Sequence, residues 1–166
     1  MPISNRGYLM DITEPGFPYI PLDYYEPPQR SGGAEWVETP IPLRSEPHHT
    51  YVNTAAQSWT ITAKIVASVE EGDFRTGLDV KNDVLFLRSL EYPDYGEGDK
   101  VRPPHEARLF MRGILDAMGI VKGVTDNYMD VSDASDEQLI VEVNFTFVVV
   151  NKIPLSYRGV RTGIVA

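Results

Sequence analysis

Residues 139–150 alternate apolar and polar side chains more strictly than any other part of the chain. One face would carry Leu139, Val141, Val143, Phe145, Phe147 and Val149, and the other Ile140, Glu142, Asn144 and Thr146. A period of two places successive side chains on opposite faces of a strand, so the pattern predicts a strand with one buried face. At about 3.3 Å per residue, twelve residues span roughly 40 Å, longer than most strands. A chain with such a segment must form a sheet.

Other segments supply partners for that sheet. Alternation from Ser58 to Ala67 predicts a second half-buried strand. A third strand is expected near 105–113, after Pro103-Pro104, and a fourth at Ile120–Tyr128. The two would form a hairpin whose turn lies at Asp116–Gly119.

One stretch has helical periodicity instead. Val80, Val84 and Leu87 follow one another at i, i+4 and i+7. With Asp79 as the cap and Pro93 as the stop signal, the spacing predicts a helix over about 79–91.

Proline placement sets the expected boundaries. Nine of the 13 prolines fall within residues 1–50, together with many aromatic side chains. Because proline interrupts helices and sheets, we expect an extended arm there, with a hinge at Gly32-Gly33 and a short strand at Glu35–Thr39. Residues 51–150 would form the compact domain, and residues 151–166 a short C-terminal tail with three cations and no acid. The predicted fold class is mixed and mainly β, a sandwich or barrel flanked by one helix.

Composition removes several classes of function. The absence of cysteine excludes disulfide scaffolds, thiolate metal sites and cysteine catalysis. A net charge of −9 argues against a surface that grips nucleic acid. No apolar run is long enough for a membrane helix, so no membrane partner is expected.

Candidate chemical groups are sparse. His48 and His49 are adjacent and would point to opposite sides of an extended chain. His105 lies beside Glu106, but a metal site needs at least three convergent ligands, and an exposed loop histidine is the favoured interpretation. Arg108 and Arg112 could hold a phosphate, although pairing with acidic residues is favoured. We therefore predict no catalytic residue, no metal site and no cofactor.

Assembly has better support than catalysis. Long strands with free edges and aromatic-bearing arms are typical of proteins that pair with neighbours. Tyr24, Tyr25, Trp36 and Tyr157 are the candidate interface anchors, with packing against the chain's own core as the alternative, above all for Trp36. An acidic ring would also let DNA pass through its bore without sticking.

The central block resembles the tail-tube-like proteins of phage baseplates, including tube-initiating and hub-adjacent proteins of contractile tails. The resemblance covers about residues 52–152 and is carried by Ser58–Lys64, Leu85–Gly96, Pro103-Pro104, Arg108-Leu109, Gly119–Val124 and Val141–Phe147. It implies a tail-tube-like β-sandwich or barrel with one helix, in a six-fold ring that joins the tail tube to the hub and other baseplate proteins. It also implies location in the virion after assembly in the host cytoplasm, and no active-site residues.

Three alternatives stay open at this point. The first is another structural role in the same particle, such as a tail terminator or a bridge to the wedges. The second is a carbohydrate-binding β-sandwich at the tail tip, which would need exposed aromatic side chains clustered on a concave face. The third is a small hydrolase, which would need a convergent acid and base around His105.

Overall fold

The computed structural model describes residues 7–22, 24–40, 48–70, 73–95, 101–129, 131–132 and 139–150. Their helix is α1 (Gly77–Ser89), and their strands are β1 (Gly7–Asp11), β2 (Tyr19–Pro21), β3 (Tyr24–Tyr25), β4 (Gln29–Ser31), β5 (Ala34–Thr39), β6 (His48–Thr54), β7 (Ser58–Val66), β8 (Ser68–Glu70), β9 (Asp73–Arg75), β10 (Asp94–Tyr95), β11 (Val101–Arg102), β12 (Ala107–Met111), β13 (Leu115–Tyr128) and β14 (Ile140–Val149). Within these residues, no helix is long and apolar enough to cross a membrane.

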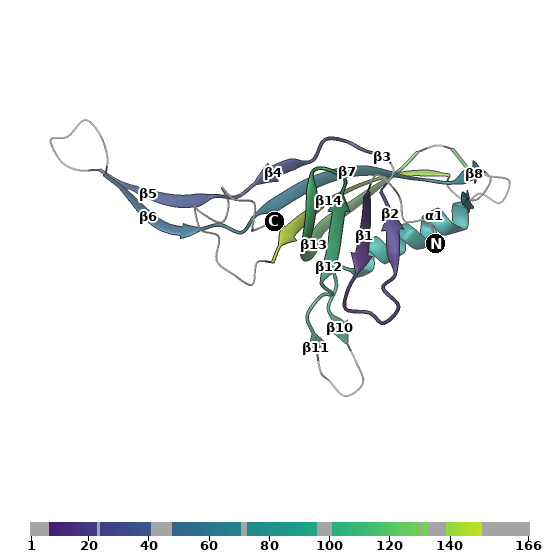
Figure 1. Ribbon diagram of the computed structural model, residues 1–166, viewed down its shortest axis with the longest axis horizontal. Coiled ribbons are helices and arrows are strands. Elements are labelled where there is room, and N and C mark those ends of the chain that lie inside the picture. Colours follow the sequence, from purple (N-terminus) through teal and green to yellow (C-terminus); the bar gives the residue numbers. More distant parts are fainter. Residues whose placement is uncertain are drawn as a thin grey trace.

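One antiparallel sheet of eight strands organises the molecule (Figure 1). Its order is β2-β1-β12-β13-β14-β7-β3, and β4 also pairs with β7. The predicted alternation of β14 is confirmed, because every second side chain from Val141 to Val149 is buried. The strand predicted from Ser58 is also present as β7, with Ile61, Ala63 and Ile65 buried. The mainly β class with one helix is therefore correct for the described residues.

The sheet curls strongly but stays open. Strand β2 ends at Pro21 on one edge, and β3 begins at Tyr24 on the other edge. Three residues span at most about 11 Å, so the covalent chain holds the two edges close together. Leu22 fills this corner, since its side chain is fully buried and its N–H donates to the carbonyl of Gly7 at 2.9 Å. In the described part of the chain β2 and β3 do not pair, so the predicted barrel is not closed.

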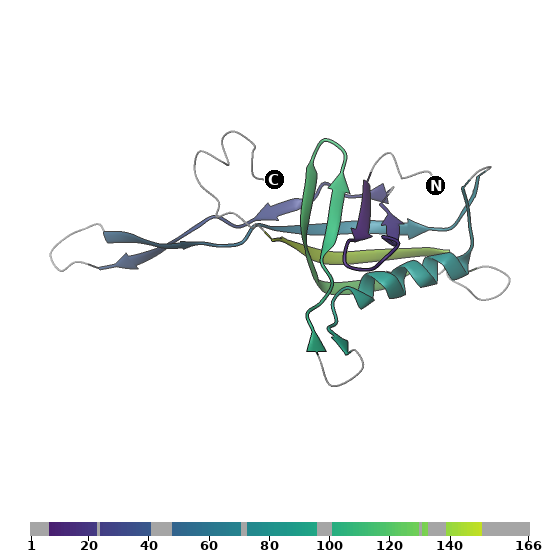
Figure 2. The same cartoon turned by 60° about the horizontal axis from the view of Figure 1, so that its bottom comes forward.

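A single apolar core lies inside the curled sheet, and α1 covers it from one side (Figure 2). Val80, Val84 and Leu87 of α1 are buried, which confirms the face predicted from their spacing. Side chains of β1, β7, β12 and β14 complete the core. The core includes Leu9 and Ile20, which come from the proline-rich part of the chain.

The predicted arm of residues 1–50 is therefore wrong for residues 7–31. Strand β1 pairs with β12 from Gly7↔Met111 to Asp11↔Ala107, and β4 pairs with β7. Prolines are tolerated because they lie at strand ends, between strands and on the β2 edge, where no sheet N–H is required. Among the described residues of the predicted arm, Ala34–Thr39 lies outside the main sheet and pairs with β6 instead. The C-terminal tail of residues 151–166 lies outside the described residues.

The turn between β12 and β13 also differs from the prediction. Residues Asp116–Gly119 lie inside β13, and the chain turns at residues 112–114 instead. Gly113 has a φ of +73°, a left-handed conformation that glycine adopts without steric cost. The position of the turn is therefore set by Gly113. Gly119 instead lies inside β13, where it pairs with both β12 and β14.

Helix α1 begins earlier than predicted. Thr76, not Asp79, is the N-cap, and the helix ends at Ser89. The Asp79 N–H donates to the Thr76 hydroxyl at 3.3 Å, and the Thr76 N–H donates to the Asp79 carboxylate at 2.7 Å. Each residue thus satisfies a backbone donor of the other, which is the reciprocal arrangement of a capping box.

Loss of this cap is expected to have a measurable cost. Thr76→Ala should lower the free energy of unfolding by about 1 kcal/mol in urea denaturation, because an N–H of the first turn loses its acceptor. The Thr76 backbone N–H is the main cause that lowers the pKa of Asp79. The stabilisation by Asp79 is therefore present above about pH 4 and is lost as the pH falls through its lowered pKa. Equal acid sensitivity of the wild type and Asp79→Asn would contradict this.

Candidate interaction surface

The β5–β6 hairpin projects from the end of the main sheet (Figure 1). It continues the ribbon of β4 and β7, and its strands form a separate two-stranded sheet with pairs from Ala34↔Thr54 to Thr39↔His48. Gly32-Gly33 lies at the junction, where Gly32 has a φ of +115° and the Ala55 N–H donates to the Gly33 carbonyl at 2.8 Å. The predicted strand at Glu35–Thr39 is confirmed as β5.

Both faces of this hairpin carry exposed apolar side chains. Trp36 is 57% exposed and Tyr51 is 50% exposed; the two pair directly, with ring centroids 5.6 Å apart and edge to face. Val37 and Val52 are exposed as well. A two-stranded hairpin is at best marginally stable alone in water. Apolar groups displayed in this way make the hairpin a candidate surface for contact with another molecule.

The charge of the hairpin is acidic. Its two strands contain Glu35 and Glu38 and neither lysine nor arginine. Glu38 lies 3.7 Å from Nδ1 of His49, on the same face as Trp36 and Tyr51, and both partners are exposed. The face therefore combines an aromatic pair with an accessible carboxylate.

The predicted interface anchors are separated by the structure. Trp36 lies on the hairpin and contacts Tyr51, so its ring does not pack against the main core. Tyr24, on β3, is exposed, whereas Tyr25 is partly buried and packs against the core. Tyr157 lies outside the described residues.

Two smaller hairpins display further exposed aromatic side chains that were not predicted from the sequence. Phe74 on β9 is 71% exposed, and Tyr95 on β10 is 76% exposed. Strands β8–β9 and β10–β11 each form a two-stranded sheet of their own. In the sequence, each of these aromatic residues directly follows an acidic residue, in Asp73-Phe74 and Asp94-Tyr95. This neighbourhood could have indicated that the aromatic side chains are exposed. The exposed aromatic side chains on these hairpins are thus distributed over separate projections.

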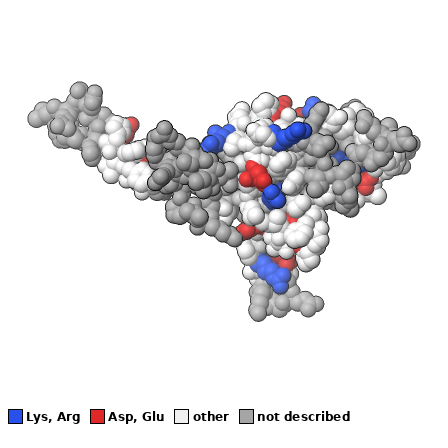
Figure 3. All heavy atoms as spheres, in the orientation of Figure 1, with Lys and Arg blue, Asp and Glu red and all other residues white. Residues whose placement is uncertain are grey.

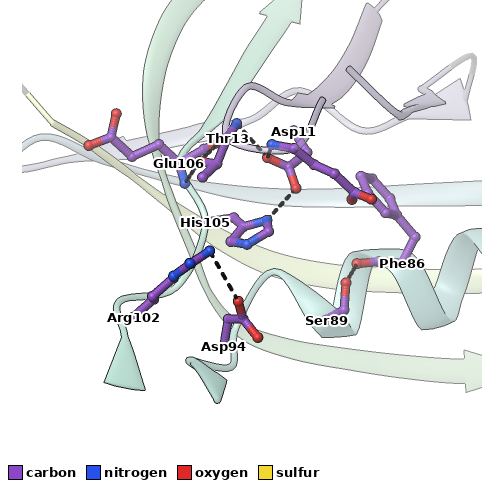
Figure 4. A network of polar contacts seen from close by, with 9 residues as sticks. Asp11, Thr13, Phe86, Ser89, Asp94, Arg102, His105 and Glu106 are labelled. Carbon is purple, nitrogen blue, oxygen red and sulfur yellow. Dashed lines mark hydrogen bonds and ion pairs between the residues drawn. The ribbon is translucent and has the colours of Figure 1, made fainter. Parts of the chain in front are cut away.

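A buried polar contact joins β1 to the segment before β12 (Figure 4). Asp11 is 1% exposed, and its Oδ2 lies 2.5 Å from Nδ1 of His105. Oδ1 accepts the backbone N–H groups of Thr13 and Glu14 at 2.7 and 3.2 Å. His105 is therefore not the exposed loop histidine that was predicted; it is half-buried and paired with a residue 94 positions away.

The same residues meet the minimum number of metal ligands. Asp11, Glu14 and His105 can bring one ligand atom each to within 4.8 Å of one another, a grouping that was not predicted from the sequence. However, both oxygens of Asp11 already accept hydrogen bonds from the protein or contact His105. The geometry thus supports a structural contact that holds β1 against the His105–Glu106 segment. Thr13 adds to it by accepting the Glu106 N–H at 3.0 Å.

The two arginines considered for phosphate binding also have a structural environment. Arg108 donates from two nitrogens to the two oxygens of Asp116 across the β12–β13 pair, both at 2.8 Å. This hydrogen bonding is the largest cause that lowers the pKa of Asp116. Arg112 lies exposed in the turn. Pairing with an acidic residue, the favoured interpretation for Arg108, is confirmed. Charged side chains of both signs are interspersed on the face seen in Figure 3.

Comparison with known proteins gives limited similarity. No protein-family model matches the chain, and no curated protein matches it. Among solved structures, the chain is similar to one described as the tail of an empty GTA particle with C6 symmetry. That similarity has a TM-score of 0.41 and 11% sequence identity, and covers 91% of this chain and 95% of the other.

Proposed function

We propose that this protein is a structural component of a phage-type tail, located at the baseplate or at the end of the tail tube. Copies of the chain would form a six-fold ring around the DNA channel and join the tube to the hub and other baseplate proteins. The observation that carries the proposal is the β5–β6 hairpin, which exposes Trp36, Val37, Tyr51 and Val52 away from the core.

The energetic argument concerns the apolar area of the hairpin. Exposed apolar surface contributes nothing to folding, whereas its burial in an interface contributes about 25 cal/mol per Å² before the cost of association. Aromatic side chains such as Trp36 and Tyr51 are the residue types that dominate interface energies. A hairpin of this composition is explained by a neighbouring subunit that covers it.

The charge and the chemistry fit a passive channel component. With a net charge of −9, the chain repels DNA, as suits a bore through which DNA must pass. Among the described residues, the buried polar cluster at Asp11 and His105 is occupied by internal contacts. We propose no enzymatic activity and no cofactor, and we expect the protein in the virion after assembly in the host cytoplasm.

A tail-tip carbohydrate module is less well supported. Such a module would use aromatic side chains gathered on one concave face. In the described residues, however, the exposed aromatic side chains of β5–β6, β8–β9 and β10–β11 lie on three separate two-stranded sheets. Separate projections suit contacts with several neighbouring subunits better than contact with one sugar chain.

The hairpin can be tested without disturbing the core. The double variant Trp36→Ala/Tyr51→Ala should retain the wild-type thermal transition to within a few degrees but lose assembly. Cryo-EM of tail particles should show a ring with wild-type protein, and the variant should be absent from the particles. Ile114→Ala is the matched control, because it removes an exposed apolar side chain at the β12–β13 turn.

Deletion of residues 1–50 would not be a suitable test, because it removes β1 to β4 from the sheet. Particles in which the double variant is incorporated as fully as wild type would contradict the role of the hairpin. Absence of the wild-type chain from tail particles would contradict the proposed function itself.

A further inference from the structure

Strand β13 has an open edge along its second half. Strand β12 pairs with β13 only from Leu115 to Gly119, whereas β14 pairs with it as far as Tyr128. Among the described strands, none pairs with the other side of β13 from Ile120 to Tyr128. Backbone groups on an open edge can pair with a strand of another chain, so such an edge is a site where identical chains aggregate.

The register of β13 and β14 shows which backbone groups face this open edge. The Met129 N–H donates to the Ile140 carbonyl at 3.2 Å, one position beyond the Tyr128↔Val141 pair. Hydrogen-bonded and non-hydrogen-bonded pairs alternate along antiparallel strands. The backbone N–H and C=O groups of Tyr128 and Asp126 therefore point away from β14, and an added strand would bond to these two residues.

Asp126 also places a buried charge on this part of the strand. It lies opposite the buried Val143, so its side chain points to the core face, where it is only 4% exposed. Nε of Arg88, near the end of α1, donates to Oδ1 of Asp126 at 2.7 Å, and a second Arg88 nitrogen donates to the same oxygen. A charge that points inward from an edge strand opposes edge pairing, because an added strand would cut the charge off from water.

Two further features lie at the same edge. The register shifts between Lys122 and Thr125, and Gly123 has a φ of +63° within this bulge. A bulge bends the strand and interrupts a regular ladder of hydrogen bonds. The Gly123 N–H donates to the carboxylate of Glu91, which follows the C-terminal end of α1. This donor is thus satisfied from within the chain, and an acidic group lies beside the edge.

We propose that Asp126, Arg88 and Glu91 together keep the open edge of β13 from pairing with the same edge of a second copy of this chain. Two identical edges related by a two-fold axis run antiparallel, as all strand pairs of the main sheet do, so the contact would be self-complementary. The inference does not depend on the proposed ring, because it concerns the single chain before assembly.

Self-association of the purified full chain tests this proposal. The triple variant Arg88→Ala/Glu91→Ala/Asp126→Ala removes the inward charge and both of the groups from α1 and its C-terminal end. Because Arg88 and Asp126 are removed together, no buried charge loses its partner. In size-exclusion chromatography with light scattering, the weight-average mass of the variant should be at least about twofold above that of wild type at the same concentration.

The matched control removes the same kinds of groups elsewhere. Arg108→Ala/Asp116→Ala/Glu14→Ala deletes an ion pair in the half of β13 that β12 covers, together with one exposed carboxylate between β1 and β2. This control should keep the wild-type mass. Tyr128→Pro, added to the first triple variant, should restore the wild-type mass, because proline removes an N–H that faces the open edge and leaves the bonding to β14 in place.

Amide hydrogen exchange locates the contact. In the first triple variant, the amides at positions 126 and 128 should exchange at least roughly tenfold more slowly at high protein concentration than at low concentration. In wild type, the exchange of the same amides should not depend on concentration.

An unchanged mass of the first triple variant would overturn the proposal. Association that persists with Tyr128→Pro, or that leaves positions 126 and 128 without protection, would also overturn it. If this triple variant did not fold, Glu91→Ala alone would carry the test, because it leaves the Arg88–Asp126 pair intact. The single variant should still raise the mass at high concentration, and a wild-type mass would then overturn the proposal.

Discussion

Gly119→Ala is expected to lower the free energy of unfolding by about 3 kcal/mol or more, or to prevent folding. Gly119 lies in β13 at the point where the strand pairs with both Ala107 of β12 and Val149 of β14. A Cβ atom there would clash with the Val148 carbonyl oxygen and would lie 2.8 Å from the Phe147 ring. Backbone on a central strand cannot move aside without loss of sheet pairing, so the clash cannot be relieved cheaply.

Urea denaturation followed by circular dichroism measures this effect. Gly33→Ala is the matched control, since a Cβ at Gly33 would have no heavy atom within 4 Å. The control should change stability by less than about 0.5 kcal/mol, as is usual for exposed positions. A midpoint for Gly119→Ala that equals the midpoint of Gly33→Ala would show that β13 and β14 do not approach each other in this register.

Asp11→Ala is expected to cost about 3 kcal/mol of stability, the second large effect. The change leaves the N–H groups of Thr13 and Glu14 without their acceptor and removes the buried partner of His105. Because β1 ends at Asp11, the loss should also loosen the edge of the sheet formed by β1 and β2.

Thermal denaturation of a small series isolates the cause. Asp11→Asn keeps an acceptor for the backbone N–H groups and should recover part of the loss. Glu14→Ala, at an exposed position, keeps the backbone N–H that donates to Asp11 and should resemble wild type. If Asp11→Ala melted at the wild-type temperature, the contact would be dispensable, and the burial of Asp11 would need another explanation.

Local patterns predicted the regular elements well. The period of two identified β7 and β14, and the period near four identified the buried face of α1. These patterns succeed because each element must present an apolar face to one core. The apolar residues of a helix or strand therefore recur along the sequence with the period of that element. Element ends were less accurate, as the shift from Asp79 to Thr76 at the helix cap shows.

The role of residues 7–31 could not be predicted from local pattern. Strands β2, β3 and β4 contain only two or three residues each, too few to show a period. Proline density suggested an arm, but short edge strands tolerate proline between them. Strands β3 and β4 are placed by pairing with β7, and β2 is placed by pairing with β1, which itself pairs with β12. Strands β7 and β12 lie far from residues 7–31 in the sequence.

The elements that form the candidate interaction surface were predicted in part. Trp36 and a strand at Glu35–Thr39 were identified from sequence, but the partner strand His48–Thr54 and the Trp36–Tyr51 pair were not. The register of a hairpin across an intervening loop depends on how the two strands meet in space. The exposure of Leu78 and Leu85 on α1 was also not predicted, because exposure is a property of the folded chain.

Sequence alone determined that this chain forms a mainly β domain with one helix, has an acidic surface charge and contains no cysteine chemistry. Those properties follow from composition and from the spacing of neighbouring residues. Only the tertiary structure decided that the sheet curls without closing, that Asp11 meets His105, and that the β5–β6 hairpin and α1 lie at opposite ends of the molecule. The physical reason is that each of these depends on contacts between residues distant in sequence, whose meeting is selected by packing of the whole core.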